Sequence, residues 1–168
     1  MPKKYGQPCP VARSLEFLGE RWTLLIVRDL LMGPRKFQDF SASLRGVAPA
    51  VLSHRLKVLE EHRIVSRRLY SEHPPRAEYA LTDRGLELRP VVRALGIWGA
   101  RHLGASWTFV HEACGANVEI AYYCPTCDET VASDQIKRRP APVQRRPAAR
   151  PKRQAGIRAG AARRRTSR

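Results

Sequence analysis

The sequence predicts a mainly helical α+β fold, in which short helices precede a two-stranded hairpin. Three observations predict it. Residues 48–65 place leucines at the spacing of a helix that buries one side. Two short β-prone runs follow, separated by a segment whose paired prolines exclude a helix. A further amphipathic repeat over 85–103 then indicates a longer helix after the hairpin.

Three helices are expected before or at the start of this region. Cys9 stands directly before Pro10 and is expected to be the N-cap of the first helix, since proline suits a first turn. Arg21–Met32 is apolar nearly all round, which predicts a buried central helix. Lys36–Leu44 repeats large apolar residues at helical spacing, and Gly46 ends this supporting helix.

The segment 48–65 has the two faces expected of a helix that enters a DNA groove. Pro49 suits its first turn, and Leu52, Leu56 and Leu59 form an apolar stripe for the core. Nearly opposite lie four small or polar residues, Ala50, Ser53, His54 and Lys57. A groove-reading helix needs little bulk at its N-terminal end, where it approaches base edges. An ordinary amphipathic surface helix would show the same stripe.

The hairpin that follows favours the DNA-binding interpretation. Ile64–Tyr70 is β-rich, Ser71–Arg76 is expected to form the turn, and Ala77–Leu81 alternates polar and apolar residues as a strand does. A helix-turn-helix followed by such a basic wing places one helix in a major groove. We therefore expect a winged helix-turn-helix. The predicted DNA-binding residues are Pro49, Ala50, Ser53, His54, Arg55, Lys57, Arg67, Arg68 and Arg76.

Within this set the residues have different expected roles. Ser53 and His54 are expected to read base edges, whereas Arg55 and Lys57 are expected to hold the phosphate backbone. The three wing arginines are expected to contact the flanking backbone or the minor groove.

Several separated motifs resemble the HxlR family of winged helix-turn-helix transcriptional regulators over about residues 9–103. They are Cys9-Pro10, Arg21-Trp22, Gly33-Pro34 with Phe37, the Leu52/Leu56/Leu59 helix, Pro75-Arg76 with Tyr79, and Leu81-Thr82 with Gly85. The resemblance implies dimers formed through terminal helices, and a cysteine near position 9 that senses oxidants or electrophiles. Two positions depart from the family pattern: Ala48 replaces a capping Ser or Thr, and Arg63 replaces a helix-ending Gly. Cys9 is also compatible with a purely structural role.

The amphipathic segment 85–103 is expected to form a dimer interface. Its apolar residues recur at spacings of three and four: Leu88, Val91, Val92, Leu95 and Trp98. A small winged-helix module has little core left to cover this stripe, so a second copy of the chain is expected to do so. We therefore expect a homodimer on a palindromic operator. The alternative is that the helix folds back onto its own domain. The regulator is expected to be a repressor, and an activator is the alternative.

Residues 105–134 are expected to form a zinc-ribbon-like hairpin. His111, Cys114, Cys124 and Cys127 form two paired ligand sets, and four soft ligands suit structural Zn²⁺. Asn117–Tyr123 between the pairs is expected to be a strand. Unligated thiols are the alternative. A redox dithiol would normally accompany a βαβ unit, and the sequence shows neither this unit nor another catalytic cluster, so we expect no enzyme.

The C-terminal residues carry most of the net charge of +16. Thirteen of the 31 Lys and Arg residues, and none of the 15 Asp and Glu residues, lie in 137–168, so the rest of the chain carries about +3. This Arg/Pro/Ala-rich tail, residues 135–168, is expected to be disordered and to add sequence-independent attraction to DNA. The alternative is a non-specific nucleic-acid-binding or nucleoid-associated protein driven by the tail.

The sequence thus predicts three parts: residues 1–104 for DNA binding and dimerisation, 105–134 for the hairpin, and 135–168 for the tail. The first residues lack the apolar core of a secretory signal, and the longest aliphatic run near them is far shorter than a membrane span. We expect a cytoplasmic, nucleoid-associated protein without a membrane partner.

Overall fold

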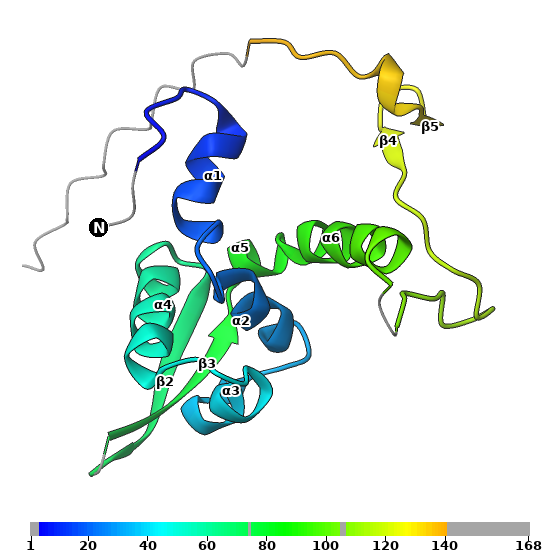
Figure 1. The fold of residues 1–168 in the computed structure, drawn as a ribbon. Helices are drawn as coiled ribbons and strands as arrows, with labels where there is room; N and C mark the ends of the chain where they lie inside the picture. Colours follow the sequence, from blue (N-terminus) through cyan, green and yellow to red (C-terminus); the bar gives the residue numbers. More distant parts are fainter. Residues whose placement is uncertain (1–3, 74, 105–106, 141–168) are drawn as a thin grey trace, which may run out of the picture. The chain divides into compact units, whose positions relative to one another are not determined.

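The computed structural model describes residues 4–73, 75–104 and 107–140 (Figure 1). The chain divides into two compact units, residues 1–121 and 122–168, and each is described by itself. The predicted tail lies almost entirely outside the described residues. No helix in the described ranges is long and apolar enough to cross a membrane.

Helix α1 (Pro10–Leu18) begins as predicted, with Cys9 at the N-cap and proline in the first turn. The central helix α2 (Thr23–Leu30) is shorter than the expected range of residues 21–32, because Trp22 adopts a left-handed backbone conformation with φ of 78°. It is also less completely buried than its composition predicts. Ile26, Val27 and Leu30 enter the core, whereas Leu25 is 39% exposed.

Helices α3 (Phe37–Ser43) and α4 (Pro49–Glu61) follow as the predicted supporting and reading helices. The leucine stripe of α4 is confirmed, since Leu52, Leu56 and Leu59 are all buried. Both positions that depart from the family pattern, Ala48 and Arg63, have a local effect at an end of α4. The N-cap residue Ala48 supplies no side-chain hydrogen bond, and Arg63 beyond the C-terminal end has a left-handed φ of 57°.

A three-stranded antiparallel sheet lies beside these helices, with the strand order β1-β3-β2. The strands are β1 (Arg35–Lys36), β2 (Val65–Glu72) and β3 (Pro75–Leu81). The wing strands are longer than predicted, because Glu72 pairs with Pro75 and leaves a much tighter turn than residues 71–76. Pro75 is tolerated there as the first residue of its strand. The pairing shifts register between Leu69 and Ser71.

The core lies between α2, α3, α4 and the start of β2. Its buried apolar residues are Ile26, Val27, Leu30, Phe40, Leu44, Leu52, Leu56, Leu59, Ile64 and Val65. Burial of a side chain of this size contributes about 1.5–3 kcal/mol relative to its exposure to water. The core therefore packs the buried face of α4 against α2, α3 and the start of β2.

The single helix expected over residues 85–103 is two helices, α5 (Asp83–Leu86) and α6 (Arg89–His102). The side chain of Thr82 caps α5 by accepting a hydrogen bond from the backbone nitrogen of Gly85, at 3.1 Å. Gly85 is required by close approach, because a Cβ there would lie 2.2 Å from the carbonyl oxygen of Ile64.

The second unit contains a short antiparallel hairpin, β4 (Tyr122–Cys124) with β5 (Glu129–Val131), and the 3-10 helix η1 (Ser133–Gln135). The strand expected over residues 117–123 is therefore present only from Tyr122 onward. Asn117 instead forms an isolated bridge with Val110 in the first unit.

Candidate nucleic-acid interface

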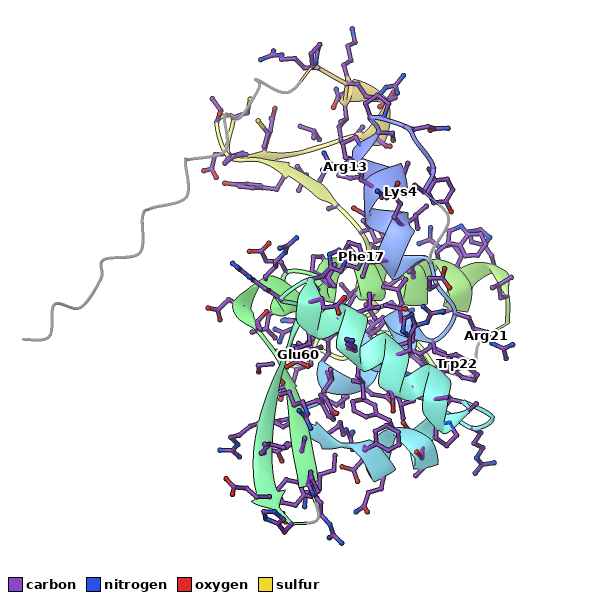
Figure 2. The ribbon with its side chains drawn as sticks, turned by 90° about the vertical axis from the view of Figure 1, so that its left-hand side faces the viewer. Lys4, Arg13, Phe17, Arg21, Trp22 and Glu60 are labelled. Atoms are coloured by element: carbon purple, nitrogen blue, oxygen red, sulfur yellow. The ribbon has the colours of Figure 1, made fainter. Side chains whose placement is uncertain are left out.

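The outer face of α4 carries the small and polar residues that are predicted to face the DNA. Ala50, Ser53, His54 and Lys57 are all exposed, opposite the buried leucines. Figure 2 shows α4 across the front of the first unit, with the wing strands β2 and β3 descending beside it. Ser53 and His54 have no ion pair or side-chain hydrogen bond in the described structure. This face is free to approach a groove.

Arg55 differs from its predicted role as a phosphate ligand. Its Nη2 lies 2.6 Å from Oε2 of Glu20, and its side chain is only 16% exposed. Its Nε is also buried and lacks a hydrogen-bond partner among the described residues. The guanidinium therefore anchors α4 to the turn between α1 and α2. Sequence spacing could not reveal this pair, because its members are 35 positions apart.

Lys57 remains available for the backbone of DNA. Its side chain is 75% exposed, and its Nζ lies 4.0 Å from Oε1 of Glu61, one helical turn further along α4. Exposed pairs of this kind contribute little to stability, about 0.3–0.5 kcal/mol. A phosphate can therefore replace Glu61 as the partner of this ammonium group at little cost.

The wing presents its arginines to solvent. Arg67, Arg68 and Arg76 are exposed, and Arg68 lies opposite Glu78 in the sheet register. The Nη2 of Arg68 is 2.9 Å from Oε2 of Glu78, whereas Arg67 and Arg76 have no ion pair within the described ranges. Two wing guanidiniums therefore lack a competing carboxylate.

Two contacts that the sequence did not suggest hold the helices around α4. Asp29 on α2 accepts hydrogen bonds from Arg28 and from the hydroxyl of Ser43 on α3. Phe17 on α1, which is labelled in Figure 2, stacks on His62 at the end of α4, and the ring centroids of the pair are 4.0 Å apart. The first contact therefore joins α3 to α2, and the second joins the C-terminal end of α4 to α1.

An apolar groove of about 380 Å³ runs between α1 and α6. Val91, Leu95 and Trp98 on α6 are 44%, 52% and 55% exposed, and Val11 on α1 is 65% exposed. Such large apolar side chains gathered on one surface are characteristic of an interaction site. Three residues of the predicted stripe are therefore exposed in the single chain, whereas Leu88 and Val92 pack against the core of their own domain.

The two predicted ligand pairs lie on turns of the same local form. In the first unit, the backbone nitrogen of Gly115 donates to the carbonyl oxygen of His111 at 2.7 Å. In the second, Asp128 donates to Cys124 in the same way at 2.9 Å. The last residue of each turn is left-handed, with φ of 69° at Gly115 and 57° at Asp128.

Each turn brings its own two donors together. Nδ1 of His111 lies 3.2 Å from Sγ of Cys114. In the other turn, backbone hydrogen bonds from Cys127 and Thr126, and a weaker one from the Cys127 side chain, lower the pKa of the Cys124 thiol. Within either unit taken by itself, the described residues contain no group of three or more His, Cys, Asp or Glu placed to hold a metal ion.

Comparison with known proteins identifies the family. A family model described as HxlR-like helix-turn-helix matches residues 17–106. An uncharacterized HTH-type transcriptional regulator of Mycobacterium tuberculosis is 35% identical over 136 residues, which cover 79% of this chain and 85% of that protein.

Solved structures give the same result. A protein of Pseudomonas aeruginosa described as a candidate transcription factor matches with a TM-score of 0.62 and 38% identity, over 80% of this chain and 94% of that one. The oxidized form of the redox regulator HypR matches with a TM-score of 0.53 and 31% identity, over 56% of this chain and 97% of that one. The chain belongs to the HxlR-like helix-turn-helix family and is a DNA-binding transcriptional regulator with a winged α+β fold.

Proposed function

We propose that this regulator is a homodimeric repressor that reads a palindromic operator with the exposed face of α4. One observation carries this proposal: Ser53 and His54 are exposed at the N-terminal half of a helix whose opposite face is fully buried. A recognition helix contacts base edges with this part of its surface. Lys57 and the wing residues Arg67 and Arg76 then hold phosphates on either side.

Substitution of the two reading residues tests this proposal. Ser53→Ala and His54→Ala are each expected to weaken binding to the operator by about 1–3 kcal/mol and to relax preference at one base position. Glu60→Gln is the matched control, because Glu60 lies on α4 toward its C-terminal end (Figure 2). Binding-site selection with each variant measures the preference. An unchanged preference in both alanine variants would refute the role of this face.

The groove between α1 and α6 supports the proposed dimer. Because Val91, Leu95 and Trp98 are about half exposed, a second copy that buries them gains apolar burial on both chains. Leu95→Glu is expected to give monomers in sedimentation equilibrium. Leu69→Glu is the control, since Leu69 is similarly exposed but lies on the wing. A Leu95→Glu chain that stays dimeric would place the interface elsewhere.

We further propose that the turns at His111–Cys114 and Cys124–Cys127 hold one structural Zn²⁺. The donors fit this ion, because imidazole nitrogen and thiolate sulfur are its preferred ligands and a set of four leaves no open position. The matching backbone form of the two turns supports the assignment. The lowered pKa of Cys124 also favours the thiolate that a metal requires. Bound zinc would cross-link two segments that bury little apolar surface.

Cys9 is proposed as a sensor of oxidants or electrophiles. It occupies the N-cap of α1 and is half-buried, and a helix N-terminus favours the reactive thiolate. The similarity to HypR, a redox regulator, supports this role. A mild electrophile is expected to change operator binding by the full chain but not by Cys9→Ser. Unchanged binding by a chain fully modified at Cys9 would end the proposal.

The basic tail is proposed to strengthen binding to any DNA sequence and to associate the protein with the nucleoid. Its 13 cations each attract phosphates without reading bases. A tail-driven, non-specific role is the competing function that these charges favour. The relatives are named as transcriptional regulators, and we propose no enzymatic activity.

A further inference from the structure

A cavity of about 560 Å³ lies in the first unit between the C-terminal end of α2, one face of α6 and the segment that follows α6. Its lining residues include Leu31 and Met32 just after α2, Arg89 and Arg93 on α6, and Trp107 and Phe109 in the following segment. Small-molecule sites in proteins have volumes of about 300–1,000 Å³. The volume is therefore sufficient for a bicyclic ligand.

This cavity uses a different face of α6 from the proposed dimer groove. Arg89 and Arg93 are four positions apart and share one face. Val91 and Leu95, which line the groove, point about 160° away from them around the helix axis. Pairing of two chains through the groove therefore does not require the face of α6 that lines the cavity.

The apolar part of the cavity wall contains aromatic side chains that a flat ring can contact. The Phe109 ring lies against Gly96 of α6, where a Cβ would come within 2.6 Å of Cε2. Trp107 meets Phe109 edge to face, with the centroids 5.3 Å apart. Met32 is 80% exposed and Trp107 is 54% exposed. An aromatic ligand would cover these side chains and remove apolar surface from water.

The polar part of the wall has an excess of positive charge. Arg28 is paired with Asp29 at 2.7 Å. Arg89 and Arg93 have no ion pair in the part of the chain that the structure describes. Three guanidiniums thus face one carboxylate around an apolar cavity. A guanidinium matches a ligand carboxylate in shape and charge.

Asp29 links this wall to the DNA-binding helices. One of its carboxylate oxygens accepts from Arg28, and the other accepts from Ser43 on α3. Helix α3 directly precedes the reading helix α4. A ligand carboxylate on Arg89 and Arg93 would lie in the same cavity as Arg28, attract its guanidinium away from Asp29, and so act on the bond that positions α3.

We propose that the cavity binds an aromatic monocarboxylate, with the ring between Met32, Trp107 and Phe109 and the carboxylate on Arg89 and Arg93. Occupancy changes operator affinity through Arg28, Asp29 and Ser43. The second statement rests on the proposed function, whereas binding of the ligand does not.

Calorimetric titration of the full chain with 2-naphthoate and with its neutral analogue 2-naphthamide tests the binding site. Naphthoate is expected to bind at least about tenfold more tightly, because hydrogen bonds from a guanidinium to a charged carboxylate are stronger than those to a neutral amide. Arg89→Gln and Arg93→Gln should each remove most of this difference. Arg84→Gln, an exposed arginine on α5 outside the cavity, should retain it. Gly96→Val, which displaces Phe109, should weaken both probes.

Equal affinities for the two probes, no binding of either, or full binding by Arg93→Gln would overturn the site. Operator binding is then measured with and without naphthoate. A change in operator affinity that Arg93→Gln abolishes supports the regulatory role. Naphthoate binding with unchanged operator affinity overturns the regulatory role alone. A chain that binds naphthoate but no DNA sequence selectively overturns the proposed function and leaves the site intact.

Discussion

The winged-helix domain, residues 10–102, and the C-terminal segment, residues 107–136, differ in the interactions that stabilise each of them. The domain has a continuous core in which Ile26, Phe40, Leu52 and Leu59 are fully buried. The C-terminal segment contains no buried residue, and Trp107, Ile120 and Tyr123 are each at least half exposed. Apolar burial therefore accounts for the order of the first region but not of the second. A segment with so little burial needs a cross-link, and the paired turns provide its ligands.

Metal removal should have the largest effect and should be confined to the C-terminal segment. Cys124→Ser is expected to lose bound zinc and the amide-exchange protection of β4 and β5, because structural zinc binding contributes about 10–16 kcal/mol in zinc-finger peptides. Protection of α4 should not change. Elemental analysis and hydrogen exchange measure both effects. Cys9→Ser is the matched control and should keep one zinc per chain. A metal-free wild-type chain would contradict this account.

Truncation of an aliphatic side chain in each region sharpens the comparison further. Leu56→Ala is expected to lower the free energy of unfolding by about 2–5 kcal/mol, because Leu56 is 1% exposed in the core. Ile120→Ala, at a position that is 50% exposed, should change it by less than about 0.5 kcal/mol. Denaturant titration gives both values. Similar losses at the two positions would mean that the C-terminal segment has a core of its own.

A better cap on α4 should stabilise the domain by a smaller amount. Ala48 supplies no side-chain hydrogen bond at the N-cap, and a Ser there would satisfy one free backbone N–H. Ala48→Ser is expected to raise the free energy of unfolding by about 1 kcal/mol. Ala42→Ser, inside α3, is the control and should lower it slightly, since serine is a weaker helix former. No gain at Ala48 would show that the first turn is capped by other groups.

The smallest expected effect is on the salt dependence of DNA binding, which should distinguish the roles of Lys57 and Arg55 on α4. Lys57→Gln should reduce the slope of log K against log salt for DNA binding by about 0.9, since one phosphate contact is lost. Arg55→Gln should leave this slope unchanged, because the guanidinium is already paired with Glu20 and is mostly covered. Salt titrations of the two variants measure the difference. A reduced slope for Arg55→Gln would show that Arg55 contacts a phosphate after all.

Patterns among neighbouring residues predicted most of this fold, whereas contacts between residues far apart in the sequence were not predicted. The spacing of Leu52, Leu56 and Leu59 was sufficient to define the buried face of α4, because helical periodicity is a property of neighbouring residues. The two-residue strand β1 was not predicted, since it exists only through its pairing with β3. The break before α2 depends on one left-handed residue, Trp22, of a type that rarely adopts this conformation.

In the candidate site, too, local patterns predicted some features, and the features that depend on distant residues were missed. Exposure of Ser53, His54 and Lys57 follows from the helical pattern, and the structure places all three on the outer face of α4. The partner of Arg55 could not be predicted, because Glu20 approaches it only through the packing of α1 and α2 against α4. The cavity beside α6 depends on Gly96 and Phe109, which no motif connects.

The most direct test of the central claim is a salt titration of DNA binding that compares residues 1–136 with the full chain, on the region upstream of its own gene and on random DNA. Our account predicts that residues 1–136 still prefer the upstream region. The full chain should bind both DNAs more tightly and with a steeper salt slope, because the tail adds phosphate contacts. If the preference disappears and only the full chain binds, all sequences alike, specific recognition by the winged helix is contradicted.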